Sequence, residues 1–237
     1  MADKKIIVTT GLPTCGKTTV SSFLGQEIGC EVLHTDSFRI GVFDTPLSMS
    51  GCQSALSYDF VFKKARQIIL NGGSVVLDGT FRRRVVRQRA YGLAESAEVS
   101  AYVVEVVCSN IAVIRERLQM REREGRPLGI TFEEYTWVKK TMEPLVDEAY
   151  PSGKGLLVPI IRYDSYLNEI SIVSYGTRAG NDTDLGLIDI VSALEKWARL
   201  KAKEGDGSEG GNKESKILPP IRFSGVRMNN LGVEEVK

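Results

Sequence analysis

Four residues near the start of the chain have types and a spacing that suit the binding of phosphate groups. Gly11, Gly16, Lys17 and Thr18 fit the pattern G-x-x-x-x-G-K-[ST] at every fixed position. The glycines permit backbone angles that let several amide N–H groups converge on one phosphate. In this pattern the lysine reaches the β- and γ-phosphates, and the threonine hydroxyl binds Mg²⁺. We therefore expect a nucleoside triphosphate site with ATP and Mg²⁺ as cofactors.

The elements around this loop occur in the order that such a site requires. The apolar run from Ile6 to Val8 predicts a buried strand, and apolar residues at 20, 23, 24 and 28 predict one face of a helix. The N-terminus of that helix would add unpaired N–H groups and a partial positive charge. The alternative is a glycine-rich turn between two core elements. The residues expected to line the nucleotide are Gly11, Leu12, Pro13, Thr14, Cys15, Gly16, Lys17, Thr18 and Thr19.

Further apolar patterns alternate between the periods of strands and helices. This alternation predicts parallel βαβ units in a three-layer α/β domain. Strands are predicted at 31–35, 74–77, 101–107, 156–161 and, less regularly, 169–173. Helices are predicted at 58–69, around 85–93, and at 110–124, 131–148 and 185–202. Residues 40–54 show no clear period and are interpreted as a loop.

Composition restricts the class of protein. A chain of 237 residues with 42% hydrophobic and 26% charged residues is typical of one globular domain with or without a tail. The net charge of +1 argues against a protein that coats nucleic acid. Four cysteines without a C-x-x-C pair, beside a single histidine, make a zinc site improbable and suit free thiols in a reducing compartment. No apolar stretch approaches transmembrane length, so we expect a cytoplasmic protein without a membrane partner.

The C-terminal part of the chain differs in composition from the rest. Residues 203–216 lack any large apolar side chain and are expected to form a flexible linker. Residues 217–237 would form a C-terminal tail, which is either mobile or docked through its apolar start. The expected organisation is therefore a domain over 1–202, a linker over 203–216 and a tail over 217–237.

Polar residues follow two of the predicted strands, at the edge where parallel sheets bind their ligands. Asp36 and Arg39 follow the second strand, where a carboxylate could accept the proton of an acceptor hydroxyl and an arginine could stabilise the transferred charge. Asp78 ends the third strand, where phosphate-loop enzymes hold a carboxylate for magnesium. Helix capping is the alternative for both aspartates, and either of them could be the base. For His34, the only histidine, we expect a structural role.

Two arginine-rich stretches could approach the same edge. The first, between 82 and 89, suits either a polyanionic acceptor or a solvated helix face. In the second, Arg117 and Arg121 lie four residues apart and share one helix face. Glycines at 125 and 129 suit a hinged lid over about 115–130 that would close on the nucleotide. A surface helix held by salt bridges is the alternative.

Together these segments resemble the phosphate-loop kinases grouped with polynucleotide 5′-hydroxyl kinase. The resemblance rests on Gly-Leu-Pro-Thr-Cys-Gly-Lys-Thr-Thr, Asp36-x-x-Arg39, Val-Val-Leu-Asp-Gly-Thr-Phe and the arginine lid, and it covers about 5–165. It implies the five-stranded parallel sheet of nucleoside-monophosphate-kinase-like proteins. It also implies Asp36 as general base, with catalytic roles for Lys17, Arg39, Arg117 and Arg121. The pair Thr14-Cys15 departs from the usual Gly-Ser and would add bulk near the phosphates.

Three functions agree with these features. The first is an ATP-dependent kinase that moves the γ-phosphoryl group to a hydroxyl of a nucleic-acid 5′ end, a nucleotide-like compound or another small molecule. The second is a nucleotide-gated switch with slow hydrolysis and no acceptor. The third is a nucleic-acid binder that uses the 82–89 arginines. Asp36, Arg39 and the lid favour the kinase, and the net charge disfavours the nucleic-acid binder.

Overall fold

The fold was analysed in a computed structural model of the whole chain. The structure describes residues 4–42, 51–125, 130–153, 156–175, 184–204, 226–229 and 232–235. The side chains of 39–42, 51–52, 204, 226–229 and 232–235 lie outside this description. Also outside it are the centre of the loop predicted at 40–54, the lid residues 126–129, and most of the predicted linker and tail.

One mixed sheet of six strands forms the centre of the domain. The strands are β1 (Lys5–Thr10), β2 (Glu31–His34), β3 (Val75–Asp78), β4 (Ser100–Val107), β5 (Ile160–Asp164) and β6 (Glu169–Ser174). Their order is β2-β3-β1-β4-β5-β6, and the first five are parallel. The five-stranded parallel sheet predicted from the sequence is thus confirmed, and β6 extends it as an antiparallel edge strand.

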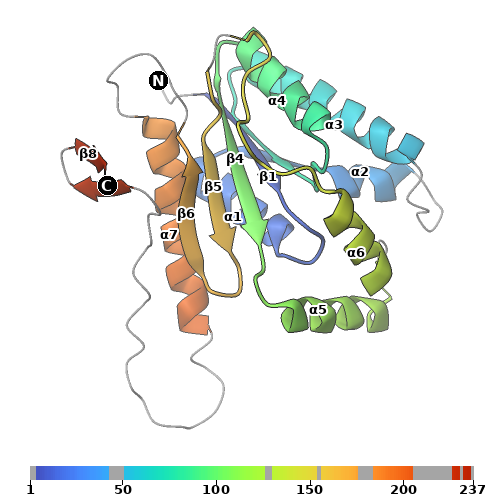
Figure 1. Cartoon of the computed structure of the whole chain (residues 1–237). Coiled ribbons are helices and arrows are strands. Elements are labelled where there is room, and N and C mark those ends of the chain that lie inside the picture. Colours follow the sequence, from blue (N-terminus) through green and yellow to red (C-terminus); the bar gives the residue numbers. More distant parts are fainter. Residues whose placement is uncertain are drawn as a thin grey trace.

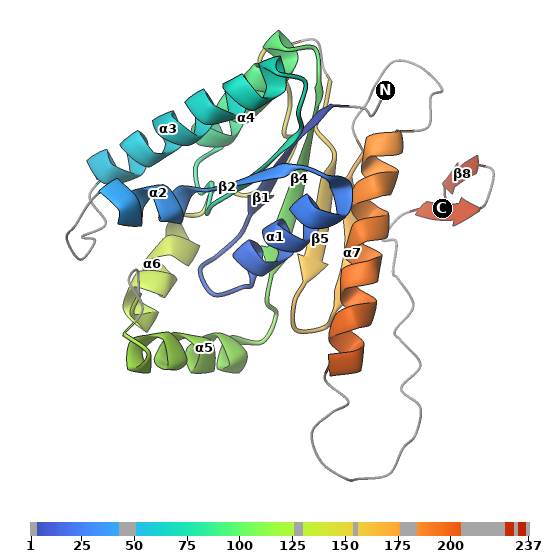
Figure 2. The ribbon, with the colours of Figure 1, turned by 180° about the vertical axis from the view of Figure 1, so that it is seen from behind.

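Helices cover both faces of the sheet (Figures 1 and 2). On one face, α1 (Lys17–Ile28) and α7 (Leu185–Glu204) pack side by side in the cluster that holds Ile7 and Val104. On the other face, α3 (Gly51–Leu70) and α4 (Arg84–Ser96) pack in the cluster that holds Val8 and Val103. Because successive side chains of a strand point to opposite faces, each central strand contributes alternately to the two clusters. The three-layer arrangement is confirmed.

The carboxyl ends of the parallel strands meet at one edge, which we call the carboxyl edge. The helices α2 (Thr35–Val42), α5 (Ile111–Arg123) and α6 (Phe132–Thr141) gather at this end of the sheet (Figure 1). The α5 side chains Ile114 and Leu118 are buried in the same cluster as α1. The first three turns of α5 are therefore part of the folded core.

The prediction of a loop over 40–54 is wrong at both ends, because α2 extends to Val42 and α3 begins at Gly51. In α3, Ser57 is fully buried and its hydroxyl donates to the Gln53 backbone oxygen at 2.8 Å. A serine satisfied in this way by its own helix can occupy a buried position. A helix predicted only from the spacing of apolar side chains does not include this buried serine.

Two later elements also differ from the prediction, and a proline explains each. The helix predicted at 131–148 ends at Thr141, because Pro144 has no N–H and disfavours helical geometry at Glu143. In place of the strand predicted at 156–161, the strand of the main sheet runs from Ile160 to Asp164, and Leu157 forms only an isolated bridge with Ala149. The strand begins directly after Pro159, which cannot donate to a sheet.

A small separate sheet lies near the end of the chain. Strands β7 (Val226–Asn229) and β8 (Gly232–Glu235) pair antiparallel and are not hydrogen-bonded to the main sheet. They fall within the tail expected at 217–237, where the sequence pattern predicts no strand. Among the described residues, the helices are all too short or too polar to cross a membrane.

Candidate active site

The phosphate loop, residues 11–18, joins β1 to α1 at the carboxyl edge. Gly11 has φ of 142°, and a Cβ on it would lie 2.1 Å from the Val106 backbone oxygen at the end of β4. Only glycine fits this contact. Gly16 has φ of 93° and precedes the first residue of α1. Both glycines of the motif therefore have the backbone role that the pattern predicts.

The first turn of α1 is arranged to receive an anion. Gly16 supplies no capping side chain, and the first turn contains no acidic residue. Its N–H groups are thus left for a ligand, and the helix dipole favours negative charge at that point. Thr18 and Thr19 are both exposed on this turn.

Lys17, the first residue of α1, lies among charged groups from several elements. Its Nζ donates to the Leu12 backbone oxygen at 2.7 Å, across the loop. Burial lowers the pKa of Lys17, while the charges of Cys15, Asp78 and Asp36 oppose this shift and that of Arg121 adds to it. The structure therefore brings Lys17 within electrostatic reach of four other predicted site residues.

The unusual pair Thr14-Cys15 is accommodated beneath the loop. Both side chains are buried, and Cys15 packs in the core cluster with Val20 and Leu24 of α1. Burial raises the pKa of the Cys15 thiol, so this side chain behaves as a small apolar group. Thr14 has φ of 64°, in the left-handed region that favours glycine. The expected bulk is therefore directed into the core, and Thr14 carries backbone strain.

Asp36 lies in the first turn of α2, directly after β2, and its side chain is exposed. Its charge contributes to the raised pKa of His34 and opposes the lowering of the Lys17 pKa. The carboxylate is thus near the phosphate loop and open to solvent. Arg39 lies one turn further along α2, and its side chain falls outside the described part of the chain.

Asp78 and His34 form a pair that the sequence did not predict. His34 Nδ1 and Asp78 Oδ2 are 2.8 Å apart, and the two residues occupy the same register position on β2 and β3. The hydrogen bond that the imidazole makes to the Asp78 carboxylate raises the pKa of His34 despite partial burial of the ring. The other carboxylate oxygen, Asp78 Oδ1, is buried and has no hydrogen-bond partner among the described residues.

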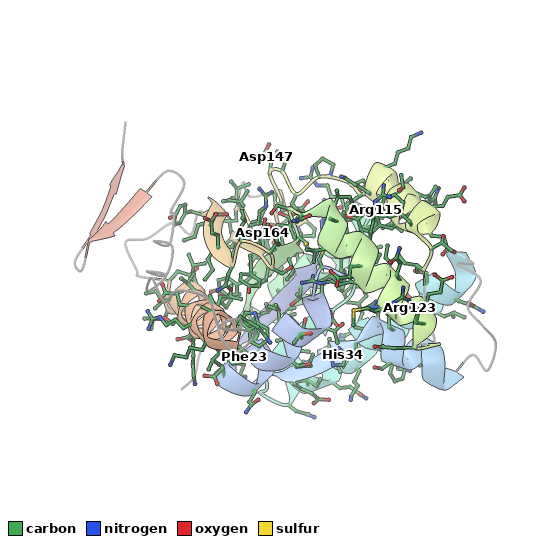
Figure 3. All side chains as sticks on the ribbon, turned by 90° about the horizontal axis from the view of Figure 1, so that it is seen from below. Phe23, His34, Arg115, Arg123, Asp147 and Asp164 are labelled. Carbon is green, nitrogen blue, oxygen red and sulfur yellow. The ribbon has the colours of Figure 1, made fainter. Side chains whose placement is uncertain are left out.

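The arginines of α5 differ in their surroundings. Arg117 Nη1 donates to the Thr14 backbone oxygen at 3.0 Å and to Ser165 Oγ at 3.4 Å. This arginine therefore links α5 to the phosphate loop and to the residue after β5. Arg121, one turn later and half-buried, lies close enough to Lys17 to lower its pKa. Figure 3 looks onto the carboxyl edge and labels Arg115 and Arg123 on α5, and His34 near α1.

The arginines between 82 and 89 are held mainly by other protein groups. Arg87 is fully buried and pairs with the equally buried Glu148 at 2.6 Å. Arg89 pairs with Asp59 at 2.6 Å, and the Arg82 guanidinium lies over the Trp137 ring at 4.6 Å. The interpretation of this whole stretch as a solvated helix face or an anion site is therefore wrong for Arg87. Its charge is neutralised inside the fold, a role that spacing alone does not reveal.

The residues present fit a nucleotide-bound magnesium ion. Thr18 presents an exposed hydroxyl in the first turn of α1, and Asp78 presents a buried oxygen that lacks a protein partner. Hydroxyl and carboxylate oxygens are the ligands that Mg²⁺ prefers, and the ion usually retains several waters beside one or two protein ligands. In the described ranges no group of three or more His, Cys, Asp or Glu side chains could hold a metal unaided.

Comparison with known proteins assigns the chain to a family. Residues 6–145, which include the phosphate loop, Asp36, Asp78 and the whole of α5 and α6, match the model of a family described as AAA domain. The chain belongs to this AAA domain family. Among curated proteins, this AAA-domain chain is 29% identical over 133 residues to uncharacterised proteins of Mycobacterium bovis and Mycobacterium tuberculosis. The match covers 51% of the chain and 26% of each relative, so the chain spans about a quarter of their length.

Solved structures share the fold of this AAA-domain protein. A kinase-like protein from Chloroflexus aurantiacus superposes with a TM-score of 0.56 and 22% identity, over 86% of this chain and 99% of that one. A sugar kinase from Janibacter gives a TM-score of 0.52 and 14% identity, over 87% and 99%. Kti12 from Chaetomium thermophilum, in complex with ADP-AlF3, gives 0.50 and 17%, over 81% and 96%. These likenesses establish the α/β fold of phosphate-loop nucleotide-binding proteins.

Proposed function

We propose that this protein is an ATP-dependent kinase that transfers the γ-phosphoryl group to a hydroxyl acceptor. The observation that carries the proposal is the place of Asp36. It is exposed at the start of α2, and its charge is close enough to Lys17 in the phosphate loop to influence the pKa of that lysine. A nucleotide-binding module without an acceptor has no need of a carboxylate there, whereas a kinase needs a base beside the γ-phosphate.

The site residues divide between the two substrates. The N–H groups of the phosphate loop and Lys17 bind the triphosphate, and Arg121 stabilises charge on the transferred group. Asp36 accepts the proton of the acceptor hydroxyl while the oxygen of that hydroxyl bonds to the γ-phosphorus. The bond from that phosphorus to the bridging oxygen breaks, and ADP leaves. Mg²⁺, held by Thr18 and Asp78 when bound, neutralises charge on the β- and γ-phosphates.

Arg39 completes the acceptor side in this proposal, one helical turn beyond Asp36 on α2. The resemblance to the polynucleotide 5′-hydroxyl kinase group supports a nucleic-acid 5′ end or a nucleotide-like acceptor. The Janibacter neighbour, a sugar kinase, supports a small hydroxyl compound instead. The Kti12 neighbour, crystallised with ADP-AlF3, supports ADP and ATP as nucleotides.

Labelled ATP tested with a panel of acceptors examines this function. The panel contains 5′-hydroxyl DNA and RNA, nucleosides and sugars, and we expect label on one class. Asp36→Asn should abolish transfer while ATP affinity stays within about twofold, because the carboxylate acts on the acceptor. Asp59→Asn, which alters an exposed aspartate on α3, is the matched control. Turnover that needs no acceptor would replace the kinase with a nucleotide-gated switch, whereas full transfer by Asp36→Asn would remove Asp36 from the mechanism.

A further inference from the structure

A row of three polar side chains crosses the carboxyl edge beside the phosphate loop. Thr9 on β1, Asp78 on β3 and His34 on β2 are paired in register across neighbouring parallel strands. Residues paired in this way point to the same face of a sheet. We call these three residues the polar row.

The neighbours along each strand show which face that is. Ile7 and Val76 precede Thr9 and Asp78 by two residues, and both belong to the cluster beneath α1. Val8 and Leu77, one residue before, belong to the opposite cluster. The polar row therefore faces α1, whose first turn carries Lys17 and Thr18. In agreement with this, the charge of Asp78 opposes the lowering of the Lys17 pKa by burial.

Two buried oxygens of this row lack a partner within the described ranges. They are Thr9 Oγ1, on a fully buried residue, and Asp78 Oδ1, on a residue only 4% exposed. Buried polar groups are almost always hydrogen-bonded, and each one that is not lowers the stability of the fold by about 1–3 kcal/mol. Such oxygens, on the face that carries the phosphate loop, are expected to bond to a ligand or to water that the ligand holds.

The third member of the row determines how Asp78 is presented. His34 Nδ1–H donates to Oδ2 at 2.8 Å, so this oxygen is occupied and the carboxylate cannot rotate freely. The side chain of His34 is 27% exposed, whereas that of Asp78 is 6% exposed. The imidazole thus lies on the solvent side of the carboxylate and restrains it from outside. The oxygen left without a protein partner is Oδ1.

We propose that His34 is a positioning residue that fixes the Asp78 carboxylate so that Oδ1 receives the hydrated magnesium ion of the bound nucleotide. This inference rests on the proposed nucleotide site but not on the identity of the acceptor. When a group that hydrogen-bonds to a metal-ligating carboxylate is removed, metal affinity or activity typically falls by about 10–100-fold. His34 thus has a defined role toward the cofactor, beyond the structural role expected from the sequence.

Calorimetric titration of ATP, with and without Mg²⁺, tests this role without an acceptor. His34→Phe keeps an aromatic ring but cannot donate, and we expect the affinity for ATP with Mg²⁺ to fall about tenfold or more. The affinity for ATP alone should change less than about twofold. His34→Asn places an amide N–H near the position of Nδ1 and should retain most of the affinity for ATP with Mg²⁺. Equal losses with and without Mg²⁺ would indicate a structural role and overturn the proposal.

A double-mutant cycle with Asp78→Asn separates an action through Asp78 from an independent one. If His34 acts only by orienting Asp78, adding His34→Phe to Asp78→Asn should not weaken ATP binding in Mg²⁺ further. An additive loss would overturn the proposal. Should His34→Phe not fold, as judged by thermal unfolding, His34→Ala compared with His34→Asn gives the same contrast. A wild-type protein that binds ATP with Mg²⁺ but labels no acceptor would remove the kinase function and leave this inference intact.

Discussion

Arg117 on α5 donates a hydrogen bond from Nη1 to the backbone oxygen of Thr14, 103 residues earlier in the chain. The bond joins a helix to the phosphate loop at the residue whose φ of 64° makes the loop backbone strained. A strained conformation persists only when surrounding contacts enforce it. We therefore interpret Arg117 as a residue that holds the loop in shape, and Arg121 as the α5 arginine placed toward the nucleotide.

Arg117→Ala should loosen the phosphate loop. We expect the dissociation constant for ATP to rise about tenfold, or about 1.4 kcal/mol, which is what loss of a hydrogen bond from a charged group leads one to expect. Isothermal titration measures this change. Arg123→Ala is the matched control, because Arg123 is exposed at the end of the same helix. Equal ATP affinities of Arg117→Ala and the wild type would remove Arg117 from loop positioning.

Thr14→Gly should stabilise the fold by about 1 kcal/mol. Glycine relieves the left-handed strain, about 1–2 kcal/mol, and removes a buried hydroxyl that has no partner among the described side chains. The greater freedom of glycine in the unfolded chain offsets about 0.5–1 kcal/mol of this gain. Urea unfolding gives the balance. Thr14→Ala removes the hydroxyl but keeps the strain, so a Thr14→Gly variant no more stable than Thr14→Ala would exclude strain as the cause.

Arg87→Ala should destabilise the protein by about 3–5 kcal/mol, because it leaves the Glu148 carboxylate buried without its partner. Tyr91 also donates to this carboxylate, at 2.8 Å, but cannot neutralise it. Arg89→Ala, which breaks the exposed pair with Asp59, should change stability by about 1 kcal/mol or less. Chemical denaturation of the two variants gives both values. Similar losses of stability in the two variants would show that the buried Arg87–Glu148 pair contributes no more than the exposed Arg89–Asp59 pair.

Stability should fall as the pH rises above about 9. Burial raises the pKa of the Cys30 thiol to about 11, and it also raises the pKa of Cys15. Unfolding returns both thiols to their ordinary pKa, so the unfolded chain binds fewer protons and gains stability with rising pH. The free energy of unfolding then decreases by at most about 1.4 kcal/mol per pH unit for each thiol.

Denaturant unfolding between pH 8 and 11 measures this dependence. Cys30→Ala should show a shallower decline than the wild type, because one of the two buried thiols is gone. Other groups that titrate in this range, such as tyrosines, contribute to both proteins and cancel in the comparison. Parallel curves would show that Cys30 does not titrate differently in the folded and unfolded chains.

Local patterns were sufficient to predict the phosphate loop, the parallel strands and most helices. Gly11, Gly16 and Lys17 define their own geometry within eight residues, and apolar periods identify buried strands and helix faces. Errors arose where a proline or a buried serine changed the local period, as at Pro144 and Ser57. The family match to an AAA domain agrees with the phosphate loop on which the first interpretation rested.

The pairings that shape the site could not be predicted in this way. His34 and Asp78 are 44 residues apart, Arg87 and Glu148 are 61 apart, and Arg117 and Thr14 are 103 apart. Each pairing depends on strand order and on the packing of α5, which a single sequence does not specify. The sequence therefore does not predict the contact of Arg117 with the phosphate loop or that of His34 with Asp78, and the catalytic role of Arg117 stays a prediction.

The strand order also has a consequence for how the protein is made. β1 is synthesised before β3 and β4, yet it lies between them and can be hydrogen-bonded on both sides only after residue 107 has been synthesised. The contact between Gly11 and the Val106 backbone oxygen requires the same length of chain. The phosphate loop therefore acquires its shape late, although it is encoded early. ATP binding therefore stabilises only chains that have been made beyond residue 107, and nascent chains that end earlier gain no stability from it.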